Sequence, residues 1–432
     1  MYDFDVIVVG GGAAGFYGAI QIATANRNIK IAILERGKQV LSKVKVSGGG
    51  RCNVTHAEFD PKELIKNYPR GEKELLGPFH SHSTGDTVTF FEDRNVPLKT
   101  EVDGRIFPVS NSSKSIIDCF HSEINRLGIH LLKNTPVTNI LQLKTNNDTT
   151  SGGWRVVTAR KEYAAKKLLL TTGSSQKIWQ LLNKLGHTII PPVPSLFTFN
   201  IKDPRISGIQ GLSSYASVEV VPRKIMSKKI SIALKSGIPK NKSLSSEGPL
   251  LITHWGMSGP VILKLSAWGA RELNAYEYRF RIKVNWLPDY HKDGVMAHLM
   301  EIKAVEPKKT ILRTQAVEIP RRLWINLVLA SGISREMQWA SASHKDLERL
   351  TEQLTQAIFS VDGKSTFKEE FVTAGGIDLK EINFKTFESK IHPHLYFAGE
   401  IINIDAITGG FNFQNAWTGA FIAAKSITST IN

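Results

Sequence analysis

The residues able to do chemistry lie near the N-terminus, in two glycine-rich stretches. In the first, Gly10, Gly12 and Gly15 form the spacing G-x-G-x-x-G. In the second, "VKVSGGGRCNVTH", three successive glycines precede Arg51 and Cys52. Glycines let a backbone approach a ligand closely, arginine can pair with phosphate oxygens, and a thiol can donate a proton. Both stretches therefore predict ligand contact, and the cysteine is either a proton donor or a small packing residue.

The elements around the first stretch would position it. A β-branched run at 6–9 predicts a buried strand, small residues at 13–25 predict a helix, and 29–34 predicts a second strand ending at Glu35. Such a turn brings backbone N–H groups and the positive end of the helix to a pyrophosphate, and the acid accepts hydrogen bonds from a ribose. This arrangement predicts a dinucleotide-binding site.

The rest of the chain suggests more than one domain, because 432 residues exceed the usual size of a single core. After "PPVPS" at 191–195, short alternating strands predict an antiparallel barrel or sandwich, and helical periodicity follows. Strand and helix patterns return near the C-terminus. We expect an α/β protein whose Rossmann-like nucleotide-binding domain is interrupted by an insertion, with the boundaries 1–190 (first part), 191–319 (barrel), 320–365 (helical insert) and 366–432 (C-terminal part).

Composition narrows the class of protein. Cys52 and Cys119 are the two cysteines, which provide no disulfide framework and no zinc site, and Cys119 beside Phe120 is typical of a buried small hydrophobe. No apolar stretch reaches 18 residues, and the acidic "MYDFD" start differs from a signal peptide. We expect a soluble, cytoplasmic protein that has no membrane partner and no metal.

The charge is strongly positive. Lys and Arg number 55 against 39 Asp and Glu, which gives a net charge of +16. Seven cations and no acid lie between Val220 and Ser246, and a second basic cluster lies at 303–322. Two interpretations stay open: an ordinary solvated surface, or a polyanionic partner such as RNA.

Several motifs together resemble one known family. They are "VVGGGAAG", "KVKVSGGGRCNVTH", "GRIFPVS", "LLLTTG", "LITHWGMSGP", "TAGGI", "FESK" and "LYFAGEIINIDAITGGFNFQNAWTGAFIA". The chain resembles the YhiN (BaiN-like) flavoproteins over essentially its whole length. The resemblance implies an FAD-binding fold of the two-dinucleotide-binding-domain type, with an inserted antiparallel β-barrel subdomain and a small helical subdomain.

The resemblance also implies site residues. The last helix, starting at 409–413, would face the N1–C2=O end of the isoalloxazine, where its positive end stabilises the reduced anionic flavin. Ala406 stands where the family commonly has glycine, so the turn there is open to question. With the glycine run, the expected FAD contacts are Gly10, Gly12, Ala14, Gly15, Glu35, Arg36, Lys43, Gly49, Arg51, Cys52, Val137, Thr172, Gly173, Gly399, Glu400, Gly409, Gly410, Phe411, Asn412 and Phe413.

Family members are linked to amine oxidation, bile-acid reduction and reduction of a 23S ribosomal RNA uridine to dihydrouridine. The basic clusters favour an RNA substrate among these. The resemblance then implies 23S ribosomal RNA or a pre-ribosomal particle as partner, with NAD(P)H as reductant. The main alternative is a small-molecule oxidase or reductase acting on an amine or enone, and a non-enzymatic FAD-binding module is a third. The expected RNA-binding residues are Arg223, Lys224, Lys228, Lys229, Lys240, Lys308, Lys309, Arg321 and Arg322.

Reducing the C5=C6 bond of uracil needs a hydride at C6 and a proton at C5. Cys52 and His254 are the candidate catalytic proton donors. The alternatives are a small residue beneath the flavin for Cys52 and a structural hydrogen bond for His254. Trp255 can stack on a base or pack in a core or lid.

Overall fold

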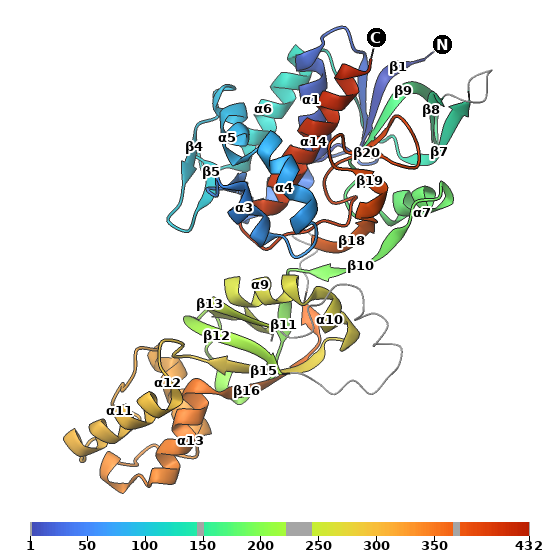
Figure 1. Ribbon diagram of the computed structural model, residues 1–432. Coiled ribbons are helices and arrows are strands. Elements are labelled where there is room, and N and C mark those ends of the chain that lie inside the picture. The colour runs from blue at the N-terminus through green and yellow to red at the C-terminus, as the bar shows by residue number, and fades with distance from the viewer. Residues whose placement is uncertain (1, 145–150, 222–243, 366–371, 432) are drawn as a thin grey trace. The chain divides into compact units, whose positions relative to one another are not determined.

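The computed structural model describes residues 2–144, 151–221, 244–365 and 372–431 (Figure 1). The chain forms two compact units. The first unit comprises Met1–Val193 and Lys368–Asn432, and the second comprises Pro194–Phe367. Each unit has its own cluster of buried apolar side chains.

A mixed sheet forms the centre of the first unit. Its strand order is β19-β20-β21-β9-β1-β2-β6, and the β7–β8 hairpin joins it where β8 pairs with β9. The pairs β21–β9, β9–β1, β1–β2 and β2–β6 are parallel. The strands are β1 (Phe4–Val9), β2 (Ile31–Leu34), β6 (His130–Leu132), β7 (Val137–Lys144), β8 (Ser151–Thr158), β9 (Glu162–Leu170), β19 (Ile382–Asn383), β20 (Glu388–Ser389) and β21 (Leu395–Phe397).

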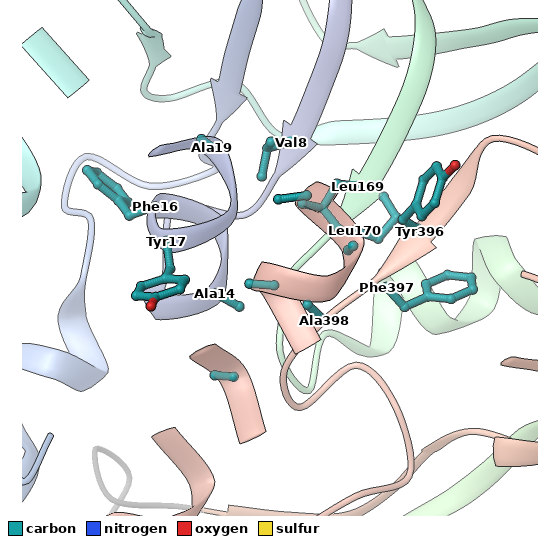
Figure 2. Packing of buried hydrophobic residues seen from close by; sticks show 14 of the residues in the cluster. Val8, Ala14, Phe16, Tyr17, Ala19, Leu169, Leu170, Tyr396, Phe397 and Ala398 are labelled. Carbon is teal, nitrogen blue, oxygen red and sulfur yellow. The ribbon is translucent and has the colours of Figure 1, made fainter. Parts of the chain in front are cut away.

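The N-terminal βαβ prediction is confirmed. β1 is followed by α1 (Ala13–Ala25) and then by β2, and every residue of β2 is buried. Figure 2 shows Val8 of β1, Ala14 of α1 and Leu169 of β9 within one apolar cluster. Central parallel strands buried on both faces explain why these segments are almost purely apolar.

Helices and two small sheets complete the first unit. α1 and α14 pack side by side (Figure 1), close enough that a Cβ on Gly18 would lie 3.5 Å from the Cβ of Ala420. The helices are α2 (Ser42–Val46), α3 (Pro61–Leu64), α4 (Glu72–Ser81), α5 (Thr84–Glu92), α6 (Ser113–Arg126), α7 (Gln176–Lys184) and α14 (Phe411–Ser429). The small sheets pair β3 (Thr55–His56), β5 (Arg105–Pro108) and β4 (Leu98–Thr100) in that order, and β10 (Ile189–Ser195) with β18 (Val372–Ile377).

Helices α4 and α5 lie in the segment between β3 and β4. Pro78 sits inside α4, where proline ordinarily argues against a helix. α5 does carry a sequence signal, since Ser83 and Asp86 form a reciprocal capping box at its start.

The second unit is built on an antiparallel sheet in the order β16-β15-β12-β13-β14-β11-β17. β16 and β17 are the two ends of this order, yet only Gly363 separates them in the chain. The Gly363 carbonyl accepts from Asn200 and its N–H donates to Tyr278, so the sheet curls until its ends meet. The strands are β11 (Thr198–Asn200), β12 (Ser213–Val221), β13 (Ser245–Ile252), β14 (Gly256–Ser258), β15 (Arg279–Asn285), β16 (Ala357–Asp362) and β17 (Lys364–Ser365).

The helices of the second unit fall into two groups: α9 packs against β13 of this sheet, whereas α11 and α12 pack on α13. α11 begins well before 320, where the helical insert was expected to start, and its N-cap His291 makes no side-chain cap bond. The usual start signal is therefore missing from the sequence. The helices are α9 (Pro260–Trp268), α10 (Ala270–Ala275), α11 (Lys292–Val305), α12 (Arg321–Ala330) and α13 (His344–Thr355).

None of the helices in the described ranges is both long and apolar enough to cross a bilayer. The fold prediction of a mixed α/β Rossmann-type protein is confirmed.

Candidate functional site

The turn between β1 and α1 requires glycine at two positions and leaves space at a third. Gly10 has φ +114°, and a Cβ there would lie 2.5 Å from the Thr171 carbonyl oxygen. A Cβ on Gly15 would lie 2.0 Å from the carbonyl oxygen of Gly10, whereas a Cβ on Gly12 would meet no atom within 4 Å. Gly10 and Gly15 therefore allow tight packing, and Gly12 borders an open space at the helix start.

That helix start is suited to an anion. Gly12 is the N-cap of α1, no side chain caps the helix, and its first turn contains no acid. The first N–H groups of a helix lack intrahelical partners and carry its positive dipole end. Ala14 lies in this turn and packs 3.3 Å from where a Cβ on Gly399 would be. A pyrophosphate placed here would satisfy these N–H groups.

The carboxylate of Glu35 is fixed at the end of β2. Its two oxygens accept from the N–H groups of Gly11 and Gly37, each at 2.8 Å. Thr135 donates its N–H to the Glu35 carbonyl, so the chain leading to Val137 runs beside this acid. An ionised carboxylate offers about four lone-pair sites, which leaves acceptor capacity for a ribose diol. The neighbouring Arg36 is exposed.

The residues that directly follow β1, β9 and β21 meet at one edge of the sheet. Thr171 donates its hydroxyl to the carbonyls of Val9 and Gly10, at 3.0 Å each. The Thr172 hydroxyl is buried and has no hydrogen-bond partner among the described residues. An orphaned buried hydroxyl beside an uncapped helix start fits a polar ligand. A dinucleotide cofactor therefore fits this set of residues.

The predicted contacts Lys43 and Glu400 form an ion pair across the fold. A Cβ on Gly173 would lie 3.5 Å from the Glu400 carboxylate, so the pair sits at the same edge as the glycine turn. Lys43 is half exposed. Its charge is balanced by the glutamate in this structure.

A second uncapped helix start lies at α14. Gly409 and Gly410 have φ +134° and +98°, and Gly410 is an N-cap without a side-chain cap bond. Asn412 bonds instead to the N–H and carbonyl of Ala406, at 3.0 and 3.2 Å. Ala406 is buried and lies outside the positive-φ set, so alanine suits this turn. Phe413 stacks on Trp417 at 5.5 Å.

Residues that the sequence analysis did not single out hold this helix start. The Tyr68 hydroxyl donates to the first carbonyl of α14 at 2.6 Å, and Thr55 donates to the Gln414 side chain at 2.6 Å. Arg70 makes a two-point ion pair with the fully buried Asp405. A lone acid in the apolar run "IINIDAITGG" is the one sequence signal that pointed to such a partner.

The glycine run at 48–50 has the backbone that only glycine adopts readily. Its three φ angles are +58°, +69° and +85°, and a Cβ on Gly49 would meet no atom within 4 Å. Arg51 pairs with Glu101 at 2.6 Å and lies 3.9 Å over the Phe107 ring. Its guanidinium is thus already engaged by protein groups, and its contact with a cofactor stays a prediction.

Cys52 is fully buried, and its N–H donates to the Ser47 carbonyl at 2.9 Å. Burial raises the pKa of the thiol to about 12, and a hydrogen bond with Ser47 opposes this only in part. The thiol therefore stays protonated at neutral pH, which fits a packing residue and makes it a weak acid. Its catalytic role stays a prediction.

His254 lies in the second unit, at the tip between β13 and β14. The N–H of Thr253 donates to the Gly256 carbonyl at 2.7 Å, which closes a two-residue turn. His254 and Trp255 are both exposed, the latter by 59%. Trp255 is therefore no core residue, and a stacking role remains open for it.

The predicted RNA-binding residues divide into two groups. Arg223, Lys224, Lys228, Lys229 and Lys240 lie outside the described residues. The other four are exposed around the α11–α12 connection, where Lys309 pairs with Glu306 at 2.7 Å; they are Lys308, Lys309, Arg321 and Arg322. No group of three or more metal-ligating side chains occurs within the part of the chain that the structure describes.

Comparison with known proteins identifies relatives along the full chain. Residues 4–426 match the HI0933-like protein Rossmann domain family. A ribosomal RNA dihydrouridine synthase of Haemophilus influenzae is 25% identical, covering 98% of each chain. The protein of the same name in Escherichia coli is 25% identical over 99% of this chain and 98% of its own. A 3-dehydro-bile acid delta(4,6)-reductase of Clostridium scindens is 24% identical over 97% and 98%.

A solved structure with the same fold is also found. A 3-ketosteroid-delta4-(5alpha)-dehydrogenase from Rhodococcus jostii, in complex with 4-androstene-3,17-dione, aligns with a TM-score of 0.50. The alignment covers 99% of this chain and 98% of that one at 11% identity, a level that speaks for the fold alone.

Proposed function

Because the chain belongs to the HI0933-like family, a family of FAD-dependent oxidoreductases, we propose that it reduces a uridine of 23S ribosomal RNA to dihydrouridine with NAD(P)H. The observation that carries this proposal is the full-length match to two proteins named ribosomal RNA dihydrouridine synthase. We propose a cytoplasmic location, where ribosomal RNA is found.

The cofactor would be held by the first unit. The open helix start at Gly12 would bind the pyrophosphate, Glu35 the adenosine ribose, and the α14 start at Gly410 the polar edge of the ring system. When bound, FAD would supply the hydride for C6 of the uracil. A further expected contact is Thr172, whose buried hydroxyl has no partner among the described residues.

The proton for C5 must come from a side chain or water near the base. Cys52 and His254 remain the proposed donors, and they differ in setting: the thiol is buried and neutral, whereas the imidazole is exposed. An exposed histidine can exchange protons with solvent between turnovers. The expected result for Cys52→Ala is retained turnover and for His254→Ala a large loss. The reverse pattern assigns the role to the thiol.

The charge of the second unit supports an RNA substrate. Lys308, Arg321 and Arg322 lie exposed around the α11–α12 connection, and the net charge of +16 of the whole chain favours polyanions. Each phosphate contact adds to the salt dependence of binding. The uracil must be unpaired or extruded, since a duplex hides its C5=C6 edge.

The direct experiment incubates the purified holoenzyme with NADPH and protein-free 23S ribosomal RNA. Nucleoside mass spectrometry then measures uridine that is heavier by two hydrogens. The matched variant Arg321→Glu, with Arg322→Glu, should lower the rate at moderate salt and leave the bound flavin unchanged. Absence of the heavier nucleoside from both RNA and pre-ribosomal particles contradicts the proposal.

A small-molecule reductase is the second candidate. It is favoured by the bile-acid reductase relative, which matches this chain over a similar length. Flavin reoxidation by a steroid enone, unaffected by the Arg321→Glu and Arg322→Glu changes, would favour this alternative.

A further inference from the structure

His56 stands where the small sheet of the first unit meets the start of α14. Its Nδ1 lies 3.1 Å from the carbonyl oxygen of Gly409. Its ring stacks on Phe411, with 4.5 Å between the centroids and 30° between the planes. The sequence analysis assigned no role to this histidine, although it ends the "VKVSGGGRCNVTH" stretch.

The tautomer of His56 follows from its partner. A carbonyl oxygen only accepts hydrogen bonds, so Nδ1 must carry a hydrogen and donate it to Gly409. Gly104 also lies against the ring, because a Cβ there would be 2.5 Å from Nε2. The backbone of His56 pairs with Arg105 in β5. The imidazole is thus a rigid donor rather than a mobile surface group.

This donor fixes the direction of the next amide. The peptide joining Gly409 and Gly410 is planar and trans, so its N–H points opposite to its C=O. With the carbonyl turned to His56, the Gly410 N–H points away from the imidazole. No described residue accepts this N–H. Neither glycine could be replaced without strain, since a Cβ on Gly410 would lie 2.6 Å from the Thr55 backbone.

We propose that His56 is a positioning residue: its bond to the Gly409 carbonyl aims the Gly410 amide and the start of α14 at the flavin, and Phe411 packs beside the imidazole. The inference rests on the proposed FAD binding. Uncapped helix N–H groups are strong donors to a partly negative ring edge only when their direction is fixed. His56 supplies that fixed direction from a separate sheet.

Four variants of His56 distinguish the effect of its N–H donor from the effect of its aromatic ring. His56→Asn keeps an N–H donor, because the asparagine amide nitrogen is as many bonds from Cβ as Nδ1 is. His56→Gln moves the donor one bond further, His56→Phe keeps a ring without a donor, and His56→Ala removes both. His80→Ala is the matched control, since His80 is exposed on α4 of the same unit.

Two readouts are needed. The FAD dissociation constant of the apoprotein, measured by flavin fluorescence, should rise about five- to tenfold for the Ala, Phe and Gln variants. It should stay near wild type for His56→Asn and His80→Ala. In the apoprotein, hydrogen exchange of the Gln414 amide, whose N–H donates to the Gly410 carbonyl at 3.0 Å, should be faster in the same three variants.

Equal FAD affinity and equal exchange across all variants would overturn the proposal. Wild-type behaviour of His56→Phe together with weakened His56→Asn would also overturn it, because stacking alone would then be sufficient. If wild-type apoprotein binds no FAD, the proposed function fails. The hydrogen-exchange experiment then still tests whether the bond between His56 and the Gly409 carbonyl orders the start of α14.

Discussion

The starts of α1 and α14 are both helix N-termini without a side-chain cap, but they are shaped in different ways. The motif that shapes the α1 start is local, because Gly10, Gly12 and Gly15 lie within six residues, and Thr171 packs against the turn they form. The α14 start depends on distant segments, including a Thr55–Gln414 bond across 359 positions. The comparison shows that two uncapped helix starts in one unit can be built differently, one from a compact motif and one from a long-range assembly.

This difference predicts that substitutions at the two helix starts act in different ways. A change in the α1 turn should act by direct steric conflict, whereas a change at α14 should act by releasing an anchor. The following variants test that contrast, beginning with the largest expected effect.

Gly15→Ala should cause the largest loss. Its Cβ would lie 2.0 Å from the Gly10 carbonyl oxygen, a backbone atom that cannot move aside cheaply. We expect a loss of about 3 kcal/mol or more in the free energy of unfolding, measured by urea denaturation. Gly12→Ala is the matched control, because its Cβ meets nothing within 4 Å.

Gly12→Ala should change stability by about 0.5 kcal/mol or less and still weaken FAD binding, since the methyl group fills the open space. If both alanine variants bind FAD like wild type, the pyrophosphate does not lie at this helix start.

Asp405→Asn should release the long-range assembly. Asp405 is fully buried against Arg70, and removing the charge of one partner leaves the other poorly compensated. We expect a loss of about 3 kcal/mol, measured by chemical denaturation. Hydrogen exchange should locate the loosening in 404–412 rather than in the α1 turn. An equal change at both helix starts would mean that the two regions are not separate.

Tyr68→Phe removes one anchor of α14 while keeping its ring. The buried hydroxyl donates to the Phe411 carbonyl at 2.6 Å, so the variant leaves that carbonyl without its partner. The expected loss is about 1.5 kcal/mol in the free energy of unfolding. Tyr290→Phe, at an exposed tyrosine, is the control and should be nearly neutral. A neutral Tyr68→Phe would show that this anchor is dispensable.

Breaking the Lys43–Glu400 ion pair should have the smallest effect on the free energy of unfolding. Lys43 is 49% exposed, so water screens the attraction. A double-mutant cycle with Lys43→Gln and Glu400→Gln should give a coupling free energy below about 1 kcal/mol. A much larger coupling would place this ion pair among the structural anchors.

The sequence predicted the α1 region in detail because its signals are local. A β-branched strand, a fixed glycine spacing and an acid at the end of the next strand suffice to place Gly10, Gly15 and Glu35. Residues of the α14 start were reached only through the family resemblance. Their physical anchors, Tyr68 and Arg70, gave no periodic or spacing signal of their own.

Two helices and the setting of Cys52 could not be predicted from the sequence for physical reasons. α4 contains a proline, and α11 starts without a capping residue, so the ordinary helix signals were absent or contradictory. Cys52 was noticed, but its full burial and raised pKa follow from packing by residues distant in the chain.

The central claim is that both helix starts serve one FAD molecule, and calorimetric titration of FAD into the folded apoprotein tests it most directly. The account predicts equimolar binding that is weakened separately by Gly12→Ala and by His56→Ala. A folded apoprotein that takes up no FAD would contradict it.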